Sequence, residues 1–261
     1  MPLARSLVVL GTTILAVSVS AQPTVNFDGR MINIADNASH WGANPPRLRL
    51  KDQPRQTIRD IKGRAAPSRS TGATNNGRLI NGWQIPPVGA GYRSIRASRK
   101  RFYGTDKMVK GIVWLGSYLK GLDSKTPDLA VGDISQRGGG KISQHASHQN
   151  GRDVDLNYFW TDTAGKPVFA ADMVSLRVGR TSNYGNKKVT FDLGRNWNLI
   201  QGLLKNPHMK VQRIFIDSSM RTALLNYARK KKVSGSLRNR ASSVMMHWKN
   251  HSNHMHVRIE N

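Results

Sequence analysis

Two short segments of the chain alternate between apolar and polar residues, as strands with one buried face do. In segment 153–159 the apolar positions are Val154, Leu156 and Tyr158, and the polar positions are Asp153, Asp155 and Asn157. In segment 254–260 the apolar positions are Met255, Val257 and Ile259, and the polar positions are His254, His256 and Arg258. If the two strands are neighbours in one sheet, their apolar faces pack into the core and their polar faces meet.

Apolar residues at helical spacing predict three helices, at 106–120, 196–205 and 218–232. The expected N-caps are Asp106 for the first helix and Ser218 or Ser219 for the third. Runs of β-branched and other apolar residues predict strands at 129–135 and 211–217. Together with the two alternating segments, these elements predict an α+β domain with a central, mainly antiparallel sheet and flanking helices.

The N-terminal third of the chain has a different character. Residues 1–21 have the pattern of a signal peptide, with Arg5 before an apolar stretch and small residues before Gln22; a membrane anchor is the alternative. Residues 22–77 are poor in apolar periodicity and are predicted to be a basic, extended tail or flexible linker, with a short helix at 57–62. A pro-region and a wall-attachment tail both fit that composition. The folded domain is predicted to span 78–261.

The composition limits both the kind of binding partner and the kind of metal ligand that the chain can have. The formal net charge of +26 favours anionic partners, such as nucleic acid, anionic lipid or an anionic envelope polymer, without choosing among them. The chain contains no cysteine, which excludes disulfides and thiolate metal sites. Any metal ion must therefore be held by imidazole and carboxylate groups.

Six of the eight histidines lie in two clusters. The first cluster contains His145 and His148, and the second contains His247, His251, His254 and His256. A catalytic zinc ion uses three protein ligands and one open position, and histidine with aspartate can supply such a site. Gly151, between His148 and Asp155, would let the backbone turn so that both side chains converge. The two clusters are thus predicted to form one metal site on the sheet.

The spacing of these residues also resembles the signature of a known group of enzymes. The pattern His148-x-x-Gly151-x-x-x-Asp155, followed by His254-x-His256, resembles the signature of zinc peptidases that include lysostaphin-type enzymes, D-Ala-D-Ala peptidases and hedgehog-type domains. Within this group the chain resembles the penicillin-insensitive murein endopeptidases. The matching segments are 82–101, 132–135, 138–140, 145–149, 151, 153–155 and 251–258. The resemblance covers 78–261 and leaves out the tail.

The resemblance implies roles for particular residues. His148, Asp155 and His256 would bind one zinc ion, and His254 would be the catalytic base. His145 and His251 would be further active-site histidines, in substrate binding or in stabilising the tetrahedral intermediate. Asp153 could orient a ligand imidazole or serve as a structural acceptor. The remaining histidines, His40, His208 and His247, are predicted to be structural or exposed.

The same resemblance implies an activity. It is that of a zinc metallopeptidase that hydrolyses peptide cross-links in bacterial peptidoglycan, at the D-alanyl–diaminopimelyl bond, and that penicillin does not inhibit. The expected location is the periplasm or the cell exterior. Members of the family carry disulfides, whereas this chain has no cysteine. Two alternatives remain: a secreted metal-dependent nuclease, which the positive charge would suit, and a non-catalytic wall-binding module with the same fold.

Overall fold

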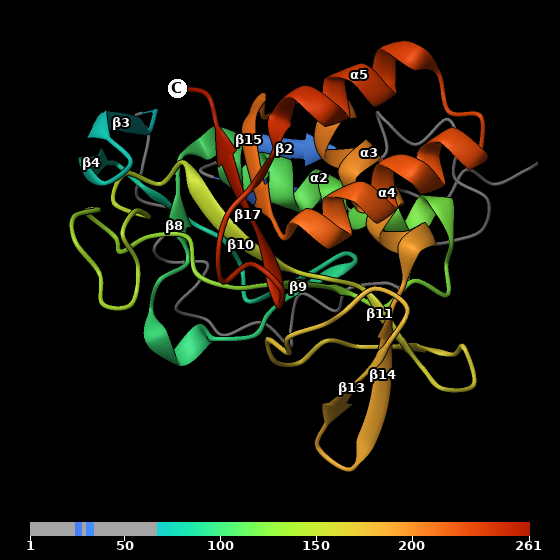
Figure 1. The fold of residues 1–261 in the computed structure, drawn as a ribbon. Helices are drawn as coiled ribbons and strands as arrows, with labels where there is room; N and C mark the ends of the chain where they lie inside the picture. The colour runs from blue at the N-terminus through green and yellow to red at the C-terminus, as the bar shows by residue number, and fades with distance from the viewer. Residues whose placement is uncertain (1–23, 28–29, 34–66) are drawn as a thin grey trace, which may run out of the picture.

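A seven-stranded mixed sheet forms the centre of the molecule (Figure 1). The computed structural model describes residues 24–27, 30–33 and 67–261. The predicted signal peptide at 1–21, the predicted helix at 57–62 and most of the predicted tail lie outside these ranges. Within them, Thr24–Phe27 (β1) pairs antiparallel with Arg30–Asn33 (β2).

The sheet has the order β16-β15-β17-β10-β9-β7-β6. Its strands are Val88–Gly89 (β6), Tyr92–Ser94 (β7), Leu129–Val131 (β9), Asp153–Asn157 (β10), Val211–Ile216 (β15), Met245–His247 (β16) and His254–Ile259 (β17). The pairs β15–β16 and β7–β9 are parallel, and the other pairs are antiparallel. The α+β class is confirmed, and the sheet is mixed because these two parallel pairs join its antiparallel centre.

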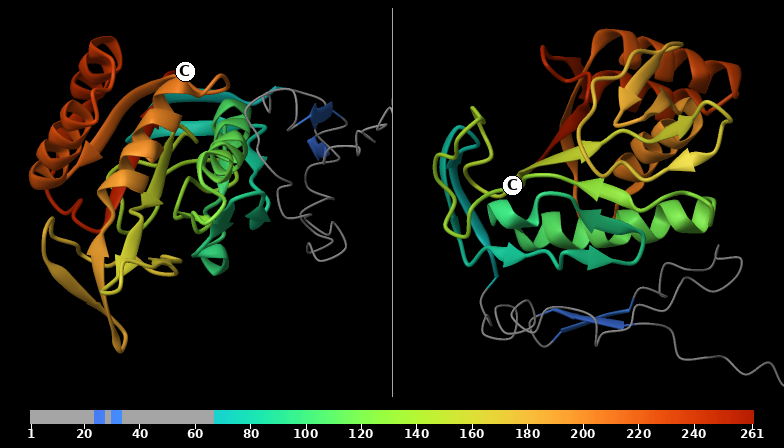
Figure 2. Two further views of the ribbon diagram at one scale, coloured as in Figure 1. Left: turned by 90° about the vertical axis from the view of Figure 1, so that its right-hand side faces the viewer. Right: turned by 90° about the horizontal axis from the view of Figure 1, so that it is seen from below.

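Helices cover one face of this sheet (Figure 2). They are Asp106–Leu122 (α2), Leu193–Lys205 (α3), Ser218–Lys230 (α4) and Gly235–Val244 (α5). Helix α3 packs against α2, α4 and α5, so the helices form one layer. The core lies between the layers, where Val154, Leu156, Met255 and Val257 have no exposed surface. Among the described residues, no helix combines the length and the apolar character needed to cross a membrane.

The N-caps differ from those expected from the sequence. Thr105, the residue before Asp106, accepts a hydrogen bond from the backbone N–H of Met108. Asp217, the residue before Ser218, accepts one from the backbone N–H of Ser219. Each cap lies before the residue or residues predicted, because the hydroxyl or carboxylate that reaches the free N–H groups is on the residue just before the first helical one.

Smaller sheets lie beside the main one. A four-stranded antiparallel sheet projects from the domain and consists of Trp160–Asp162 (β11), Pro167–Val168 (β12), Thr181–Tyr184 (β13) and Lys187–Phe191 (β14) (Figure 1). Trp83–Gln84 (β5) pairs with Tyr103–Gly104 (β8), and Ala97–Arg99 forms a short 3-10 helix (η3).

The flexible linker expected in the last part of the 22–77 tail is wrong for 69–77. Arg69–Ala73 (β3) and Asn76–Ile80 (β4) form a β-hairpin. The Gly-, Asn- and Thr-rich residues that suggested a linker form the turn of this hairpin. Backbone hydrogen bonds to a loop distant in sequence hold the hairpin in place. The Leu79 N–H donates to the Gly138 carbonyl at 3.1 Å, and the Thr74 carbonyl accepts from the Gln149 N–H at 3.0 Å. The described domain therefore begins before residue 78.

Asn196 on α3 fixes the chain just after strand β10. Its Oδ1 accepts from the Phe159 N–H at 2.9 Å, and its Nδ2 donates to the carbonyls of Phe159 and Asp192 at 2.7 and 2.8 Å. The Asn196→Ala variant should lose about 3 kcal/mol of unfolding free energy, because buried backbone groups lose their partners. Urea unfolding measures this loss. The exposed Asn183→Ala variant is the control and should change stability by less than about 0.5 kcal/mol; equal losses in both variants would contradict the assignment.

Candidate metal centre and active-site cleft

Strands β10 and β17 bring the two polar faces together. They pair antiparallel, with Asp155 opposite His256, Asn157 opposite His254 and Asp153 opposite Arg258. The apolar residues of both strands face the helices, so these side chains lie on the other face of the sheet. The prediction that the polar faces meet is confirmed.

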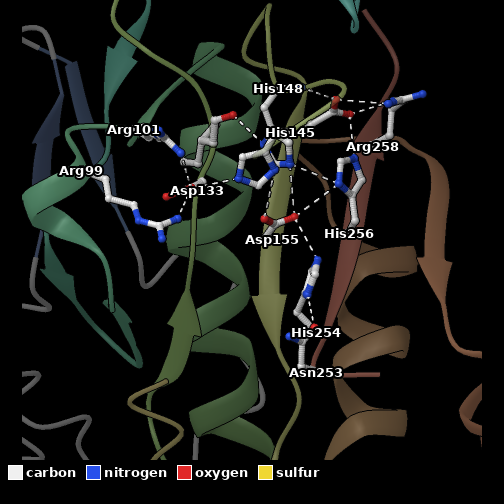
Figure 3. Close-up of polar contacts among 12 residues, drawn as sticks. Arg99, Arg101, Asp133, His145, His148, Asp155, Asn253, His254, His256 and Arg258 are labelled. Carbon is white, nitrogen blue, oxygen red and sulfur yellow. Dashed lines mark hydrogen bonds and ion pairs between the residues drawn. The ribbon is translucent and has the colours of Figure 1, made fainter. Parts of the chain in front are cut away.

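Three side-chain atoms form a tight triangle at this place (Figure 3). His148 Nε2 lies 3.1 Å from His256 Nδ1 and 3.2 Å from Asp155 Oδ1, and the last two atoms are 3.3 Å apart. Ligands of a tetrahedral zinc ion, at bond lengths near 2.0–2.1 Å, are separated by about 3.3 Å. Asp155 Oδ1 is buried and makes no hydrogen bond within the part of the chain that the structure describes. Spacing and chemistry both fit a divalent metal ion.

The other nitrogen of each imidazole in the triangle faces an acceptor. His148 Nδ1 is 2.7 Å from the Ile134 carbonyl, so it carries the proton and leaves the Nε2 lone pair free. His256 Nε2 is 3.3 Å from Asp153 Oδ1. Such contacts fix the tautomer and the ring orientation of metal-binding histidines.

Asp153 makes contacts of both kinds considered for it from the sequence. It contacts the His256 ring, and its Oδ2 accepts from the backbone N–H of His148 at 3.1 Å. The Arg258 guanidinium donates to it through Nε at 2.7 Å. Burial opposes the charged carboxylate, but His256 and Arg258 outweigh this and lower the pKa of Asp153 far below its usual range.

A second set of three residues shares two members with the triangle. Ligand atoms of His145, His148 and Asp155 all lie within 4.8 Å of one another. His145 Nδ1 is 3.9 Å from Asp155 Oδ2, and its Nε2 is 3.0 Å from Asp133 Oδ2. Because these distances are longer than those to His256, the set with His256 is the tighter candidate metal site, and His145 lies beside it.

Asp133 is a site residue that the sequence reasoning did not identify. It is 2% exposed and pairs with Arg99 at 3.0 Å, Arg101 at 3.2 Å and His145 at 3.0 Å (Figure 3). Burial raises its pKa, but His145 and Arg99 more than offset this and lower the pKa overall. The carboxylate thus orients His145. Its only sequence signal was its place in the matching segment 132–135.

His254 faces the triangle from the end of β17. Its Nε2 is 3.5 Å from Asp155 Oδ1, and its Nδ1 is 2.6 Å from the side-chain oxygen of Asn253. That oxygen can only accept, so the proton lies on Nδ1 and Nε2 keeps its lone pair. Burial lowers the pKa of His254 to about 4, with the Asp155 charge opposing the shift. The imidazole is therefore neutral near pH 7.

His251 lies next to His254, with ring centroids 4.8 Å apart. Its Nδ1 is 2.8 Å from the Lys249 carbonyl, and burial lowers its pKa. The Tyr158 hydroxyl donates to the His251 carbonyl at 2.8 Å and so holds this loop near the sheet.

A cleft of about 630 Å³ opens over these groups. Its lining comprises Thr74, Asn75, Gln144, His145, Ala146, Ser147, His148, Phe215, Trp248, Lys249, Asn250, His251, His254, His256 and Arg258. Trp248 is 57% exposed, which offers an apolar surface beside the polar centre. The sequence analysis did not anticipate Phe215, Trp248 or the β3–β4 turn as parts of this wall.

The two other histidines in the described part of the chain lie apart from the cleft lining. His247 is exposed on β16, and His208 is half-buried after α3. His40 lies outside the described residues. The structure thus brings five of the six clustered histidines together and leaves His247 aside.

A model of the penicillin-insensitive murein endopeptidase family matches residues 70–261. The chain belongs to this family. The resemblance drawn from the sequence is confirmed, and the match includes residues 70–77, which the sequence reasoning had assigned to a linker.

Curated relatives of this chain carry the family name. The penicillin-insensitive murein endopeptidase of Haemophilus influenzae is 30% identical over 204 residues, covering 76% of this chain and 64% of the relative. Those of Klebsiella pneumoniae strain 342 and Escherichia coli K12 are each 29% identical, covering 74% of this chain and 66% of each relative. The chain therefore matches slightly less than two thirds of the length of these relatives.

Metal binding at the triangle should release a proton. Burial lowers the pKa of His256, but Asp153 and Asp155 outweigh this and raise it to about 9. The metal-free protein therefore holds that proton at about pH 7.5, and a metal ion needs the Nδ1 lone pair. Calorimetric titration in buffers of different ionisation enthalpy should show about one more proton released at about pH 7.5 than at about pH 10.5. The His254→Ala variant is the control and should keep this difference; an unchanged count between the two pH values would refute the assignment.

Proposed function

We propose that this protein is a zinc-dependent peptidase that hydrolyses peptide cross-links of bacterial peptidoglycan. The observation that carries the proposal is the triangle of His148, Asp155 and His256, which lies at the floor of a cleft beside a neutral His254. The relatives named as murein endopeptidases support the substrate class. The bond cut would be the D-alanyl–diaminopimelyl cross-link, and penicillin would not inhibit the reaction because no serine is acylated.

Each ligand group has a clear part in this proposal. His148 Nε2, His256 Nδ1 and Asp155 Oδ1 would hold one zinc ion. Such an ion supplies an activated water near neutral pH and a positive charge that polarises the scissile carbonyl. Asp153 would keep His256 in the orientation that directs Nδ1 at the metal.

The neighbouring histidines would handle protons and charge. His254 Nε2 is unprotonated and faces Asp155, so His254 can take a proton during attack and return it to the leaving amine. His145, held by Asp133, presents its other nitrogen toward the same place and would stabilise negative charge on the carbonyl oxygen. His251 would contact the substrate at the cleft wall.

The proposed location is the periplasm or the cell exterior, where this substrate is found. The basic surface would then favour contact with carboxylate and phosphate groups of the envelope. The secreted nuclease has no support from the relatives, which are named as endopeptidases. A non-catalytic wall-binding module would bind peptidoglycan without releasing monomers, whereas the proposed enzyme releases them.

Muropeptide analysis tests the activity directly. The protein from residue 22 onward is incubated with cross-linked peptidoglycan, with and without a zinc chelator. Dimers should disappear, two monomers should appear for each dimer lost, and the chelator should stop this. Mass spectrometry of the products names the bond. Wall binding without release of any monomer by the zinc-loaded protein would refute the enzyme and support the binding module.

Substitutions separate metal binding from proton transfer. His148→Ala, Asp155→Ala and His256→Ala should each lower zinc content and activity together, because each removes a ligand. His254→Ala should keep zinc and lose activity by about 100-fold or more, as expected for a general base. Elemental analysis and muropeptide release are the two measurements.

His247→Ala is the matched control, since His247 belongs to the same sequence cluster but is exposed and outside the cleft lining. It should keep both zinc and activity. A fully active His254→Ala variant would show that another group is the base.

A further inference from the structure

A second pocket lies beside the candidate active-site cleft. It has a volume of about 420 Å³, and its lining includes Asn75, Asn76, Arg78, Gly140, Lys141 and Gln149. Asn75 lines both this pocket and the cleft. Gln149, on its wall, directly follows His148 of the triangle. A chain lying in the cleft can therefore continue past the hairpin turn into this pocket.

The pocket is built between the β3–β4 hairpin and the loop that carries the first histidine cluster. The Gly140 N–H lies within hydrogen-bond distance of the Gln149 carbonyl at 2.8 Å and of the Gly77 carbonyl at 3.2 Å. The Asn150 side chain donates to the Gly72 carbonyl at 3.2 Å. These bonds join hairpin and loop, so the pocket has a fixed position relative to His148.

The charge of the pocket is positive. Arg78 and Lys141 are both exposed, and no described carboxylate forms an ion pair with either of them. All the other lining residues are uncharged. The Arg78 guanidinium lies over Gly140, where any Cβ atom would collide with Nη1. The absence of a side chain at Gly140 thus leaves room for the guanidinium at this place.

We propose that this pocket is a subsite for a free carboxylate of the peptide substrate. The inference rests on the proposed function, because the stem peptides of peptidoglycan carry free carboxylates beside the cross-link. Arginine presents a planar fork of donors that matches a carboxylate, and Lys141 adds a second positive charge. The side-chain amides of Asn75, Asn76 and Gln149 suit the peptide groups next to it.

The test compares two substrates and three proteins. The substrates are soluble cross-linked peptide dimers with free carboxylates and the same dimers with the carboxylates converted to primary amides. The proteins are the zinc-loaded wild type, the Arg78→Gln/Lys141→Gln variant and the Lys187→Gln/Lys188→Gln variant. The last pair lies exposed on β14 and removes the same charge, so it controls for a general electrostatic effect.

The wild type should cleave the acidic dimer with a KM about tenfold lower than that of the amidated dimer, as expected for charge-assisted hydrogen bonds. The Arg78→Gln/Lys141→Gln variant should lose this preference through KM, with kcat within about twofold and unchanged thermal stability. The Lys187→Gln/Lys188→Gln variant should keep the preference. Equal KM values of the wild type for both substrates, or equal losses in both variants, would overturn the subsite while leaving the proposed function intact.

If the wild type cleaves neither dimer, the proposed function fails, and binding decides the subsite separately. Calorimetry then compares the acidic and amidated forms of an uncross-linked stem peptide. Tighter binding of the acidic form, lost in the Arg78→Gln/Lys141→Gln variant, supports a carboxylate subsite. Equal binding of both forms overturns it.

Discussion

The register between β10 and β17 is the constraint on which the candidate site depends. It places Asp155 opposite His256 while Val154 and Val257 face the helices. A slip of one residue would turn the apolar residues to the solvent face and the carboxylates into the core. The helix layer therefore specifies the candidate metal centre indirectly, because burial of the apolar face of the sheet places these imidazole and carboxylate groups on the other face. The Arg258–Asp153 pair across the two strands favours the same register.

The distribution of charge distinguishes the three buried carboxylates. Asp133 is paired with two arginines and Asp153 with one, so both are compensated by permanent charges. Among the described residues, Asp155 has only imidazole partners, from His145, His148, His254 and His256. Burial opposes its charge, but His148 and His256 outweigh this and lower the pKa of Asp155. A bound divalent cation would take over this compensation from the proton that His256 holds. The arrangement thus favours Asp155 as the carboxylate that would bind a metal ion, while Asp133 and Asp153 contact the neighbouring imidazoles.

The sequence pattern predicted those strands and helices whose apolar residues repeat at the spacing of a buried face. The two alternating strands and three of the helices were found because their apolar periodicity reports a buried face. Helix α5 was missed because it buries little, with Ala241 and Val244 as its buried residues. The β3–β4 hairpin was missed because bonds to residues 138 and 149 give it order. Asp133 was missed for the same reason, since its partners Arg99 and His145 lie far away in sequence and only the fold brings them together.

The loop that carries the first histidine cluster belongs both to the candidate metal centre and to the cleft wall. His148 has a positive φ of 66°, which costs an ordinary residue about 1 kcal/mol. Its position is nevertheless determined at both ends, because Asp153 holds its backbone N–H and the Ile134 carbonyl holds its ring. Gly151 follows with a φ of 74°, and a Cβ atom there would press against Leu79 of the hairpin. The turn at His148 and Gly151 therefore directs His148 at Asp155 and also packs against the hairpin. The same backbone contacts thus set the distance between the candidate metal centre and the second pocket.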